Sequence, residues 1–292
     1  MRSETDAAFR FHRLLSHPLT RGRDINHPST TSLRRTIVQS KPFVRRIYDE
    51  WYRKIASHIP SLPGQVLEVG SGAGFLADYV PDLITSEVFS LPGIRCVLDG
   101  VSLPFAGGSL KGIVMTNVLH HIQEPSALFA EAQRCLRPGG AVILVEPWVS
   151  RWSRVVYTRL HHEPFLPEHP SWSHSLAGPL SGANGALPWI ILQRDRQAFE
   201  AQFPDLAITK TELLMPFRYL VSGGVTMRSL MPGITFRLWE LLETGMKPWM
   251  DRWAMFALVV VEKRERNQER AISASTPPEL SRGRIPRIGA ST

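Results

Sequence analysis

The residues with the clearest chemical meaning form a glycine-rich run over 68–74 (EVGSGAG) that follows a short apolar stretch. Glycines at alternate positions after a strand let the backbone turn tightly and approach a ligand closely. The spacing differs from the G-x-G-x-x-G phosphate fingerprint, because Phe75 stands where its last glycine would lie. The carboxylate of Glu68 would repel a pyrophosphate but suits a ligand that carries an ammonium and a sulfonium.

These residues need a frame, and the hydrophobic pattern predicts one. Apolar strands are expected over 65–69, 83–88, 94–98, 112–118, 141–145, 206–214 and 254–262, with helical patterns over 40–59 and 125–136. Alternating strands and helices imply a parallel sheet covered by helices, an α/β fold. Glu87 and Asp99 then lie near the ends of the second and third strands. His120 and His121 follow the fourth, at the carboxyl edge where such sheets bind ligands.

Four motifs in order make the stretch 65–147 resemble the class I S-adenosylmethionine-dependent methyltransferases, especially the ubiquinone/menaquinone-type small-molecule subgroup. They are the E-x-G-x-G-x-G loop at 68–74, Asp99-Gly100 leading into Leu103-Pro104-Phe105, Asn117-Val118-Leu119-His120-His121, and Leu136-Arg137-Pro138-Gly139-Gly140. The resemblance implies a Rossmann-like seven-stranded sheet with an antiparallel final hairpin and helices on both faces. It also implies a lid built from the inserts after strands 5 and 6.

The resemblance assigns a cofactor, S-adenosyl-L-methionine as methyl donor, and its binding residues. Glu68 and the backbone of Gly70, Ser71, Gly72 and Gly74 would hold the methionine end. Glu87 would accept hydrogen bonds from the ribose, Asp99 would receive the adenine amino group, Gly100 and Val101 would flank the ring, and Asn117 would line the methionine carboxylate or the reacting face. Glu87 departs from the usual family pattern because an apolar stretch follows it, so a solvated strand-end carboxylate is its alternative role.

An alcohol acceptor needs a general base whose pKa lies near the working pH. The candidates are His121 and His120, of which we expect at most one to face the pocket, and His162. Their alternative roles are wall and helix-start residues, or polar residues on a loop. Glu146, after the fifth strand, would orient the acceptor. We expect no metal, because the cluster His161, His162, Glu163, His169 and His174 matches no established ligand spacing.

The chain divides into three parts on composition. Residues 1–39 are expected to form a basic, mostly irregular arm, 40–263 the methyltransferase domain and 264–292 a disordered tail. The domain would comprise a cofactor half, 64–147, and two acceptor or lid inserts, 148–205 and 215–253. Two segments of these inserts, 181–189 and 217–220 (FRYL), are expected to form walls of the acceptor site. We favour a packed lid over membrane contact for the aromatic second insert. In a membrane-facing lid, an anionic headgroup or carboxylate would be met by Arg151, Arg154, Arg159 and Arg218.

The net charge of +8 belongs to the ends of the chain. Residues 1–46 hold ten Lys/Arg and three Asp/Glu, 264–292 hold six and three, and the intervening 47–263 hold 18 and 20. No basic face is left in the central region, so a nucleic-acid partner is not favoured. No apolar run reaches the ~20 residues of a membrane span. With two cysteines and no secretory pattern, we expect a cytoplasmic protein and leave peripheral membrane contact open.

The chain is therefore expected to be an enzyme, a transferase that moves a methyl group to a small-molecule, lipid or glycan-type acceptor. Oxygen is favoured over carbon as the methylated atom, and nitrogen is third. One alternative is an RNA or protein methyltransferase, which only the basic ends suggest. Another is a non-catalytic S-adenosylmethionine-binding scaffold. A nicotinamide dehydrogenase is disfavoured by the glycine spacing. The acceptor, the methylated atom and the oligomeric state depend on inserts without a recognised motif.

Overall fold

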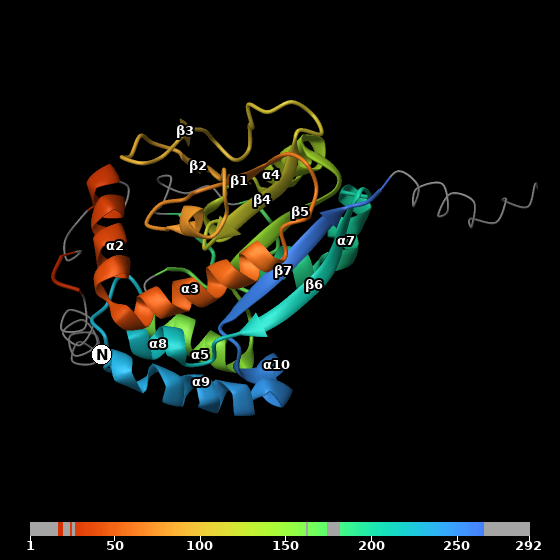
Figure 1. The fold of residues 1–292 in the computed structure, drawn as a ribbon. Helices are drawn as coiled ribbons and strands as arrows, with labels where there is room; N and C mark the ends of the chain where they lie inside the picture. Colours follow the sequence, from red (N-terminus) through yellow and green to blue (C-terminus); the bar gives the residue numbers. More distant parts are fainter. Residues whose placement is uncertain (1–16, 20–23, 25–26, 162, 174–181, 266–292) are drawn as a thin grey trace, which may run out of the picture.

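The computed structural model describes residues 17–19, 24, 27–161, 163–173 and 182–265, and a seven-stranded sheet forms their centre (Figure 1). The strands are β1 (Gln65–Glu68), β2 (Ile84–Glu87), β3 (Cys96–Val97), β4 (Leu110–Thr116), β5 (Leu136–Pro147), β6 (Leu206–Leu214) and β7 (Phe256–Lys263), in the order β3-β2-β1-β4-β5-β7-β6. The first five strands are parallel, and β7 is antiparallel to both β5 and β6. The expected sheet and final hairpin are confirmed.

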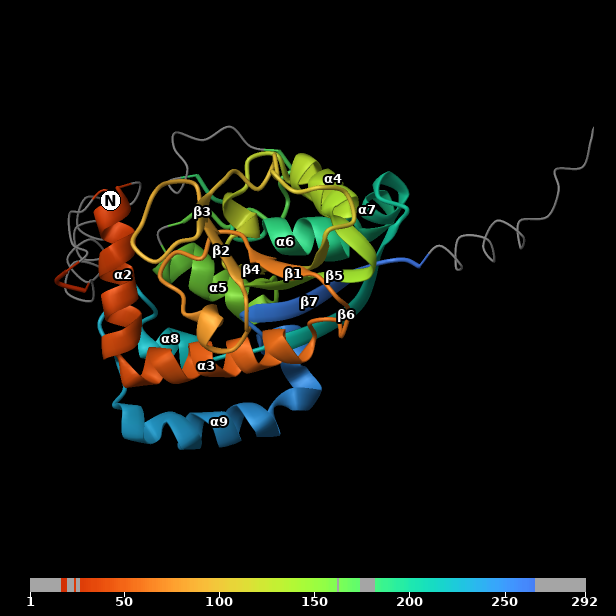
Figure 2. The same ribbon diagram turned by 45° about the horizontal axis from the view of Figure 1, so that its top comes forward.

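Helices cover both faces of this sheet (Figure 2). They are α2 (Pro28–Ser40), α3 (Pro42–Ser57), α4 (Pro125–Cys135), α5 (Arg151–Leu160), α6 (Leu187–Trp189), α7 (Arg196–Gln202), α8 (Arg218–Ser222), α9 (Phe236–Gly245) and α10 (Met250–Trp253). Short 3₁₀ turns lie at η1 (Leu76–Asp78), η2 (Leu119–His121), η4 (Gly233–Thr235) and η5 (Lys247–Trp249), and η3 (Ile190–Arg194) is a π-helical turn.

Alternation along the strands divides the interior into two cores. Val66 and Ile143 point to one face, where they pack with α3, α5 and α9. Leu67 and Val142 point to the other, where they pack with α4, α6 and α7. Buried side chains on both faces are what a parallel sheet requires, and this explains the nearly continuous apolar runs from which the strands were predicted.

One expectation for the N-terminal arm is wrong. The range 1–39 was expected to be mostly irregular, but residues 28–40 form the helix α2. His27 caps this helix by accepting a hydrogen bond from the Ser29 amide, and Pro28 lies in its first turn. The helix has few apolar residues, and tertiary packing of Ile37 and Val38 overrides the weak pattern. Residues 1–16 and 266–292 lie outside the described residues, so the arm's start and the expected tail stay predictions.

The joint between α2 and α3 is fastened to the second insert. Lys41, the residue between the two helices, is buried, and its Nζ donates hydrogen bonds to the carbonyls of Gly224 (2.6 Å) and Met227 (2.9 Å). Burial lowers the pKa of Lys41 to about 8. This contact holds α2 against the loop that follows α8.

The fourth strand ends earlier than predicted. β4 stops at Thr116, and Asn117 adopts a left-handed conformation with φ 57°. Asparagine tolerates this region better than most residues because its short polar side chain bonds locally. The reversal turns the chain out of the sheet and starts η2, which carries both histidines of the predicted site. β5 also begins earlier than expected, at Leu136, which pairs with Leu110.

The two inserts contain helices and a buried ion pair. Arg218, on α8, was expected to meet an anionic headgroup or carboxylate only in a membrane-facing lid, and its side chain is buried and bonded to Glu243 of α9 and Glu50 of α3. Arg218 therefore ties the insert to the core and does not face solvent. Among the described residues, no helix is long and apolar enough to cross a membrane.

Candidate functional site

A cavity of about 1060 Å³ opens at the carboxyl ends of β1 and β4, where strand order reverses. Among its lining residues are Thr31, Arg34, Tyr48, Tyr52, the loop Val69 to Gly74, Glu87, Leu98, Gly100, Asn117, Val118, His120, His121, Tyr157, Arg159, Glu163, Tyr219, Met227 and Leu230. Open α/β sheets bind ligands at such a reversal. The volume exceeds what one drug-sized ligand needs, typically about 300–1,000 Å³, so it has room for a nucleoside cofactor and a second molecule.

The glycine loop forms one wall of the cavity. At Gly70 and Gly74 the surrounding atoms leave no room for a side chain. Gly70 has φ 66°, and a Cβ added there would lie 2.7 Å from Val118 Cγ2. A Cβ on Gly74 would lie 2.5 Å from the Tyr52 hydroxyl and 2.9 Å from the Ser71 carbonyl oxygen. All four predicted loop residues, Gly70, Ser71, Gly72 and Gly74, line the cavity. The loop is a cradle of bare backbone, as close approach of a ligand requires.

Two acids lie at this loop with burial-raised pKa values. Burial, reinforced by the charge of Glu87, raises the pKa of Glu68 to about 7. Burial also raises the pKa of Glu87, which accepts hydrogen bonds from the backbone of Val88 and Gly72. Glu87 lines the cavity, and Glu68 is buried behind the loop. Two acids beside bare backbone fit a cationic ligand, which would stabilise their ionised forms.

The remaining predicted cofactor residues divide into two groups. Gly100 and Asn117 line the cavity. Asp99 and Val101 do not contribute to its wall: Asp99 is exposed, and its carboxylate accepts a hydrogen bond 3.1 Å from the Val101 amide. The structure therefore places Asp99 at the rim, as the cap of the turn that presents Gly100.

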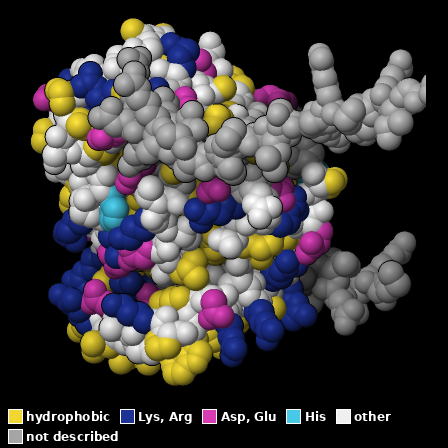
Figure 3. Space-filling view, turned by 90° about the vertical axis from the view of Figure 1, so that its right-hand side faces the viewer, with side chains coloured by type: hydrophobic (Ala, Val, Ile, Leu, Met, Phe, Trp, Pro, Cys, Tyr) yellow, Lys and Arg dark blue, Asp and Glu magenta, His cyan; other side chains and the backbone are white. Residues whose placement is uncertain are grey.

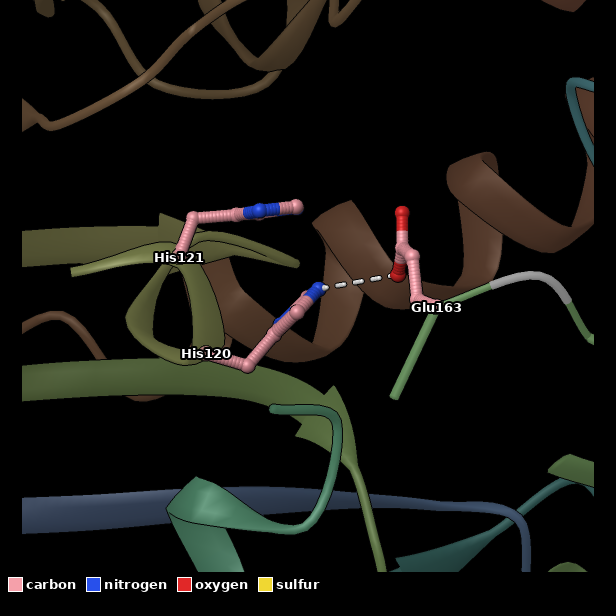
Figure 4. A group of neighbouring side chains, drawn as sticks. All are labelled: His120, His121 and Glu163. Carbon is pink, nitrogen blue, oxygen red and sulfur yellow. Dashed lines mark ion pairs between the residues drawn. The ribbon is translucent and has the colours of Figure 1, made fainter. Parts of the chain in front are cut away.

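His120 has the most specific environment of the predicted catalytic residues. Its Nδ1 lies 2.6 Å from Glu146 Oε2, and its Nε2 lies 3.8 Å from Glu163 Oε2 (Figure 4). Glu146 is fully buried and also accepts hydrogen bonds from the Val118 and Leu119 amides, each at 2.7 Å. Glu146 thus bonds His120 and the start of η2, and it is not among the residues that line the cavity, where its predicted role would place it.

The Glu146 contact determines which ring nitrogen of His120 is available. A carboxylate at Nδ1 favours the tautomer that carries its proton there, which leaves the lone pair of Nε2 directed at the cavity. Burial lowers the pKa of His120, but the charge and hydrogen bond of Glu146 and the charge of Glu163 outweigh it, and the net pKa is raised. The arrangement is that of an oriented general base.

His121 also lines the cavity, but it has the opposite electrostatics. Burial and the neighbouring His120 lower its pKa to about 3, so its ring is neutral near physiological pH. Its Nδ1 lies 3.2 Å from the Gly182 carbonyl oxygen, and its ring packs on that of His120 with centroids 4.2 Å apart. Both histidines face the cavity, although we expected at most one, because they lie on a 3₁₀ turn and not on a strand.

No metal was expected from the sequence, but one group of side chains among the described residues could offer ligand atoms to a metal ion. Ligand atoms of His120, His121 and Glu163 lie within 4.8 Å of one another. Of the cluster considered from the sequence, His161 lies 3.8 Å from Glu163, whereas His162 and His174 lie outside the described residues.

The sequence reasoning missed the far wall of the cavity. Tyr48 and Tyr157 are contributed by α3 and α5, and Thr31 and Arg34 by α2. Burial raises the pKa of Tyr48 to about 12, and Asn117 bonds its side chain. No motif marks these residues, because they come from separate elements that only the fold brings together.

Comparison with known proteins finds a family match over the part of the chain that contains the glycine loop. Residues 67–144 match the family described as "Methyltransferase domain". This stretch is a methyltransferase domain. The match covers the loop, Glu87, Gly100, Asn117 and both cavity histidines, and with the cradle and its acids it supports S-adenosylmethionine as the methyl donor.

Curated relatives match the same part of the chain. A demethylmenaquinone methyltransferase of Renibacterium salmoninarum is 29% identical over 111 residues, which are 33% of this chain and 47% of that protein. An uncharacterized methyltransferase of Mycobacterium sp. (strain JLS) is 39% identical over 95 residues, 27% and 37% of the two chains. The chain thus spans half or less of the curated relatives it matches, and the methyltransferase domain is what they share.

Solved structures with similar folds have low scores. A geranyl diphosphate C-methyltransferase from Streptomyces coelicolor, solved with Mg²⁺, geranyl diphosphate and S-adenosyl-L-homocysteine, is 12% identical at TM-score 0.47, covering 85% of this chain and 89% of that one. A Haemonchus contortus N-methyltransferase is 14% identical at TM-score 0.46, covering 85% and 60%. At these scores neither carries the functional argument, which depends on the site itself.

Proposed function

We propose that this protein transfers a methyl group from S-adenosylmethionine to a hydroxyl oxygen of a lipophilic small molecule. The observation that carries the proposal is one continuous cavity with the bare glycine loop on one side and the Glu146–His120 pair on the other. The loop suits the cofactor, and an oriented base suits an acceptor that must lose a proton. Carbon and nitrogen acceptors that lose no proton before transfer have no use for that base.

The methyl donor supplies the chemistry as an activated sulfonium, and the chain positions and deprotonates its partner. The loop 70–74 and the acids Glu68 and Glu87 would hold the donor at its methionine and ribose parts. His120 Nε2 accepts the hydroxyl proton of the acceptor, and the resulting imidazolium is stabilised by Glu146 at Nδ1. Glu163, 3.8 Å from Nε2, adds negative charge beside that proton. Glu146 acts through His120 and is a positioning residue.

The geometry supports His120 over His121 as this base. With a pKa of about 3, neutral His121 has little tendency to accept a proton, and its ring serves as a wall that packs on His120. A pKa above the usual value places His120 nearer the working pH of an enzyme.

The first test is calorimetric titration with S-adenosylhomocysteine, using the wild type and Glu68→Ala. Micromolar binding that the substitution weakens would support the cofactor site. A labelled methyl donor would then be offered with alcohols and phenols of increasing chain length. Absence of cofactor binding by the folded wild type would reject the enzyme and favour the scaffold alternative. Methyl incorporation into RNA or protein, and into none of the small molecules, would reject the acceptor class.

We further propose that the acceptor reaches the cavity from a lipid surface. Of 14 large hydrophobic side chains exposed among the described residues, eight lie in the second insert: Leu230, Met231, Ile234, Leu238, Leu241, Leu242, Trp249 and Trp253. Apolar side chains gather along the lower edge of the molecule, where Figure 1 shows α9 and α10 (Figure 3). Leu230 also lines the cavity, so this face continues into it. An amphipathic helix with exposed tryptophans is typical of interfacial binding.

Two exposed basic residues accompany this face and complement an anionic surface: Arg46 donates to the Gly233 carbonyl and lies over Phe236 of α9, and Lys247 begins η5. The test is co-sedimentation with phosphatidylcholine vesicles, with and without phosphatidylglycerol. We expect the double variant Leu238→Asp/Leu241→Asp to lose vesicle binding. The matched control Val97→Asp/Leu166→Asp, which alters exposed apolar residues outside the second insert, should retain it. Equal binding by both variants, or a dimer that the first variant dissociates, would contradict a lipid partner.

A further inference from the structure

An arginine on α2 lines the cavity. Arg34 lies in the cavity wall, and its Nε is buried and has no hydrogen-bond partner among the described residues. A buried donor without a partner is costly, and a guanidinium keeps its charge in proteins. The position therefore calls for a ligand that supplies acceptor atoms.

Neighbouring residues on α2 show which part of the cavity Arg34 serves. Arg35, the next residue, donates from Nη2 to the Gly72 carbonyl at 3.2 Å, and its charge acts on Glu68. Thr31 packs near Gly72. Arg34 acts elsewhere: burial dominates the pKa of Tyr48, Tyr219 and His121, and the charge of Arg34 lowers each of them as a smaller influence. Arg35 thus belongs to the cofactor loop, and Arg34 to the side of the proposed acceptor.

The two acids of the cavity wall have partners of their own, and among the described residues neither is found in an ion pair with Arg34. In the described part of the chain, the acids that line it are Glu87 and Glu163. Glu87 accepts from the backbone of Val88 and Gly72, and Glu163 faces His120 and His161. A positive charge thus remains in a largely apolar chamber, and the forked donors of arginine match a carboxylate or a phosphate.

We propose that Arg34 binds an anionic group, a carboxylate or a phosphate, on the acceptor. The acceptor is then an amphiphile with an apolar body, a hydroxyl at His120 and an anion at Arg34. This inference depends on the proposed acceptor site, and the experiment is arranged so that the two fail separately.

The experiment measures binding of three probes with the same chain, decyl phosphate, decanoate and decanol, to protein saturated with S-adenosylhomocysteine. The variants are Arg34→Gln, Arg34→Lys and, as the matched control on the same helix, Arg35→Gln. Affinity for S-adenosylhomocysteine itself is measured for each variant, and thermal unfolding confirms that each is folded.

We expect the wild type to bind at least one of the anionic probes more tightly than decanol. Arg34→Gln should weaken that binding about tenfold or more, since a hydrogen-bonded charge is lost, and Arg34→Lys should restore part of it. Arg35→Gln should show the reverse pattern, with weaker S-adenosylhomocysteine and nearly unchanged anion binding. Which probe binds more tightly distinguishes a carboxylate from a phosphate.

Three results would overturn the inference. Wild-type protein that binds S-adenosylhomocysteine but prefers neither anion over decanol has no anion site, although its cofactor site stands. Anion binding that survives in Arg34→Gln places the site elsewhere. If Arg34→Gln instead weakens S-adenosylhomocysteine, Arg34 binds the methionine carboxylate of the cofactor and not the acceptor. A wild type that binds no S-adenosylhomocysteine contradicts the proposed function itself.

Discussion

The two sides of the cavity are built by different means. On the cofactor side, between β1 and β4, backbone forms the wall, and glycines at 70 and 74 leave no room for a Cβ. On the acceptor side, aromatic and charged side chains from α2, α3, α5 and α8 form the wall. The first side suits one fixed ligand that the backbone contacts directly. The second can be changed residue by residue without altering the sheet.

The strongest test of this division is His120→Ala. It should reduce the rate of methyl transfer by about 10²- to 10⁴-fold, because the general base is lost. Binding of S-adenosylhomocysteine should change less than twofold, since His120 belongs to the acceptor side. The measurements are steady-state kinetics with the identified acceptor and calorimetry. An equal loss of cofactor affinity would show that the two sides are not separable.

The side-chain wall also depends on buried charge, which Arg218→Met tests. Arg218 is 5% exposed and its partner Glu243 is 3% exposed, so the substitution leaves a buried carboxylate without its cation. We expect a loss of about 3–5 kcal/mol in the free energy of unfolding, measured with urea. The control Arg237→Met removes an exposed pair with Glu240 and should cost less than about 1 kcal/mol. Similar losses in both variants would contradict a structural role for the buried pair.

The backbone wall is tested by Gly74→Ala. The added methyl group would meet the Tyr52 hydroxyl and the Ser71 carbonyl, so the loop must shift. Affinity for S-adenosylhomocysteine should fall roughly ten- to hundredfold. Gly245→Ala, where nothing lies within 4 Å of the new Cβ, is the control and should bind normally. Normal cofactor affinity in Gly74→Ala would show that the ligand does not need this close approach.

The backbone wall of the cavity could be predicted from the sequence better than the side-chain wall. Gly70, Ser71, Gly72 and Gly74 were found because a backbone wall needs consecutive residues, which form a readable motif. Tyr48 and Arg34 could not be found, because each is one residue on a helix whose own pattern gives no sign of the cavity. The polar helix α2 was missed for a related reason: its stability comes from packing and not from a local apolar stripe.

The roles of His120 and His121 also could not be separated from the sequence alone. Both residues at 120 and 121 were candidates from position alone, but the choice between them depends on Glu146, 26 residues away and on another strand. The carboxylate was predicted at the pocket edge as a group for the acceptor. Only the paired register of β4 and β5 reveals that it is enclosed and serves His120.

A smaller effect is expected from pH on cofactor binding. Because the pKa of Glu68 is about 7, the carboxyl is increasingly neutral below that pH and attracts the ammonium of S-adenosylhomocysteine less. Affinity should therefore fall as pH drops below 7, by no more than about tenfold per unit. Glu68→Gln should bind more weakly and show a flatter dependence when titrated at the same pH values. An unchanged slope in that variant would assign the effect to another group.

The smallest expected effect is the shift in the pH dependence of the rate, which tests the proposed base on the acceptor side. The rate should rise with pH as His120 loses its proton, with a midpoint above the usual histidine value. Glu146→Gln removes the charge that raises this pKa, so the midpoint of the remaining activity should move to lower pH. Profiles of kcat/KM for both proteins measure this. A midpoint that moves upward or stays in place would contradict the orienting role of Glu146.

The bonds of α2 have a consequence for the catalytic cycle. Arg35 holds this helix to the glycine loop at one point, and Lys41 holds its end to the carbonyls of Gly224 and Met227 at another. One helix thus contributes to the cavity wall beside both proposed binding sites. Withdrawal of α2 would uncover both binding sites together, so spent donor and methylated product would leave during a single open interval, and the rate of that one movement would set an upper limit on turnover.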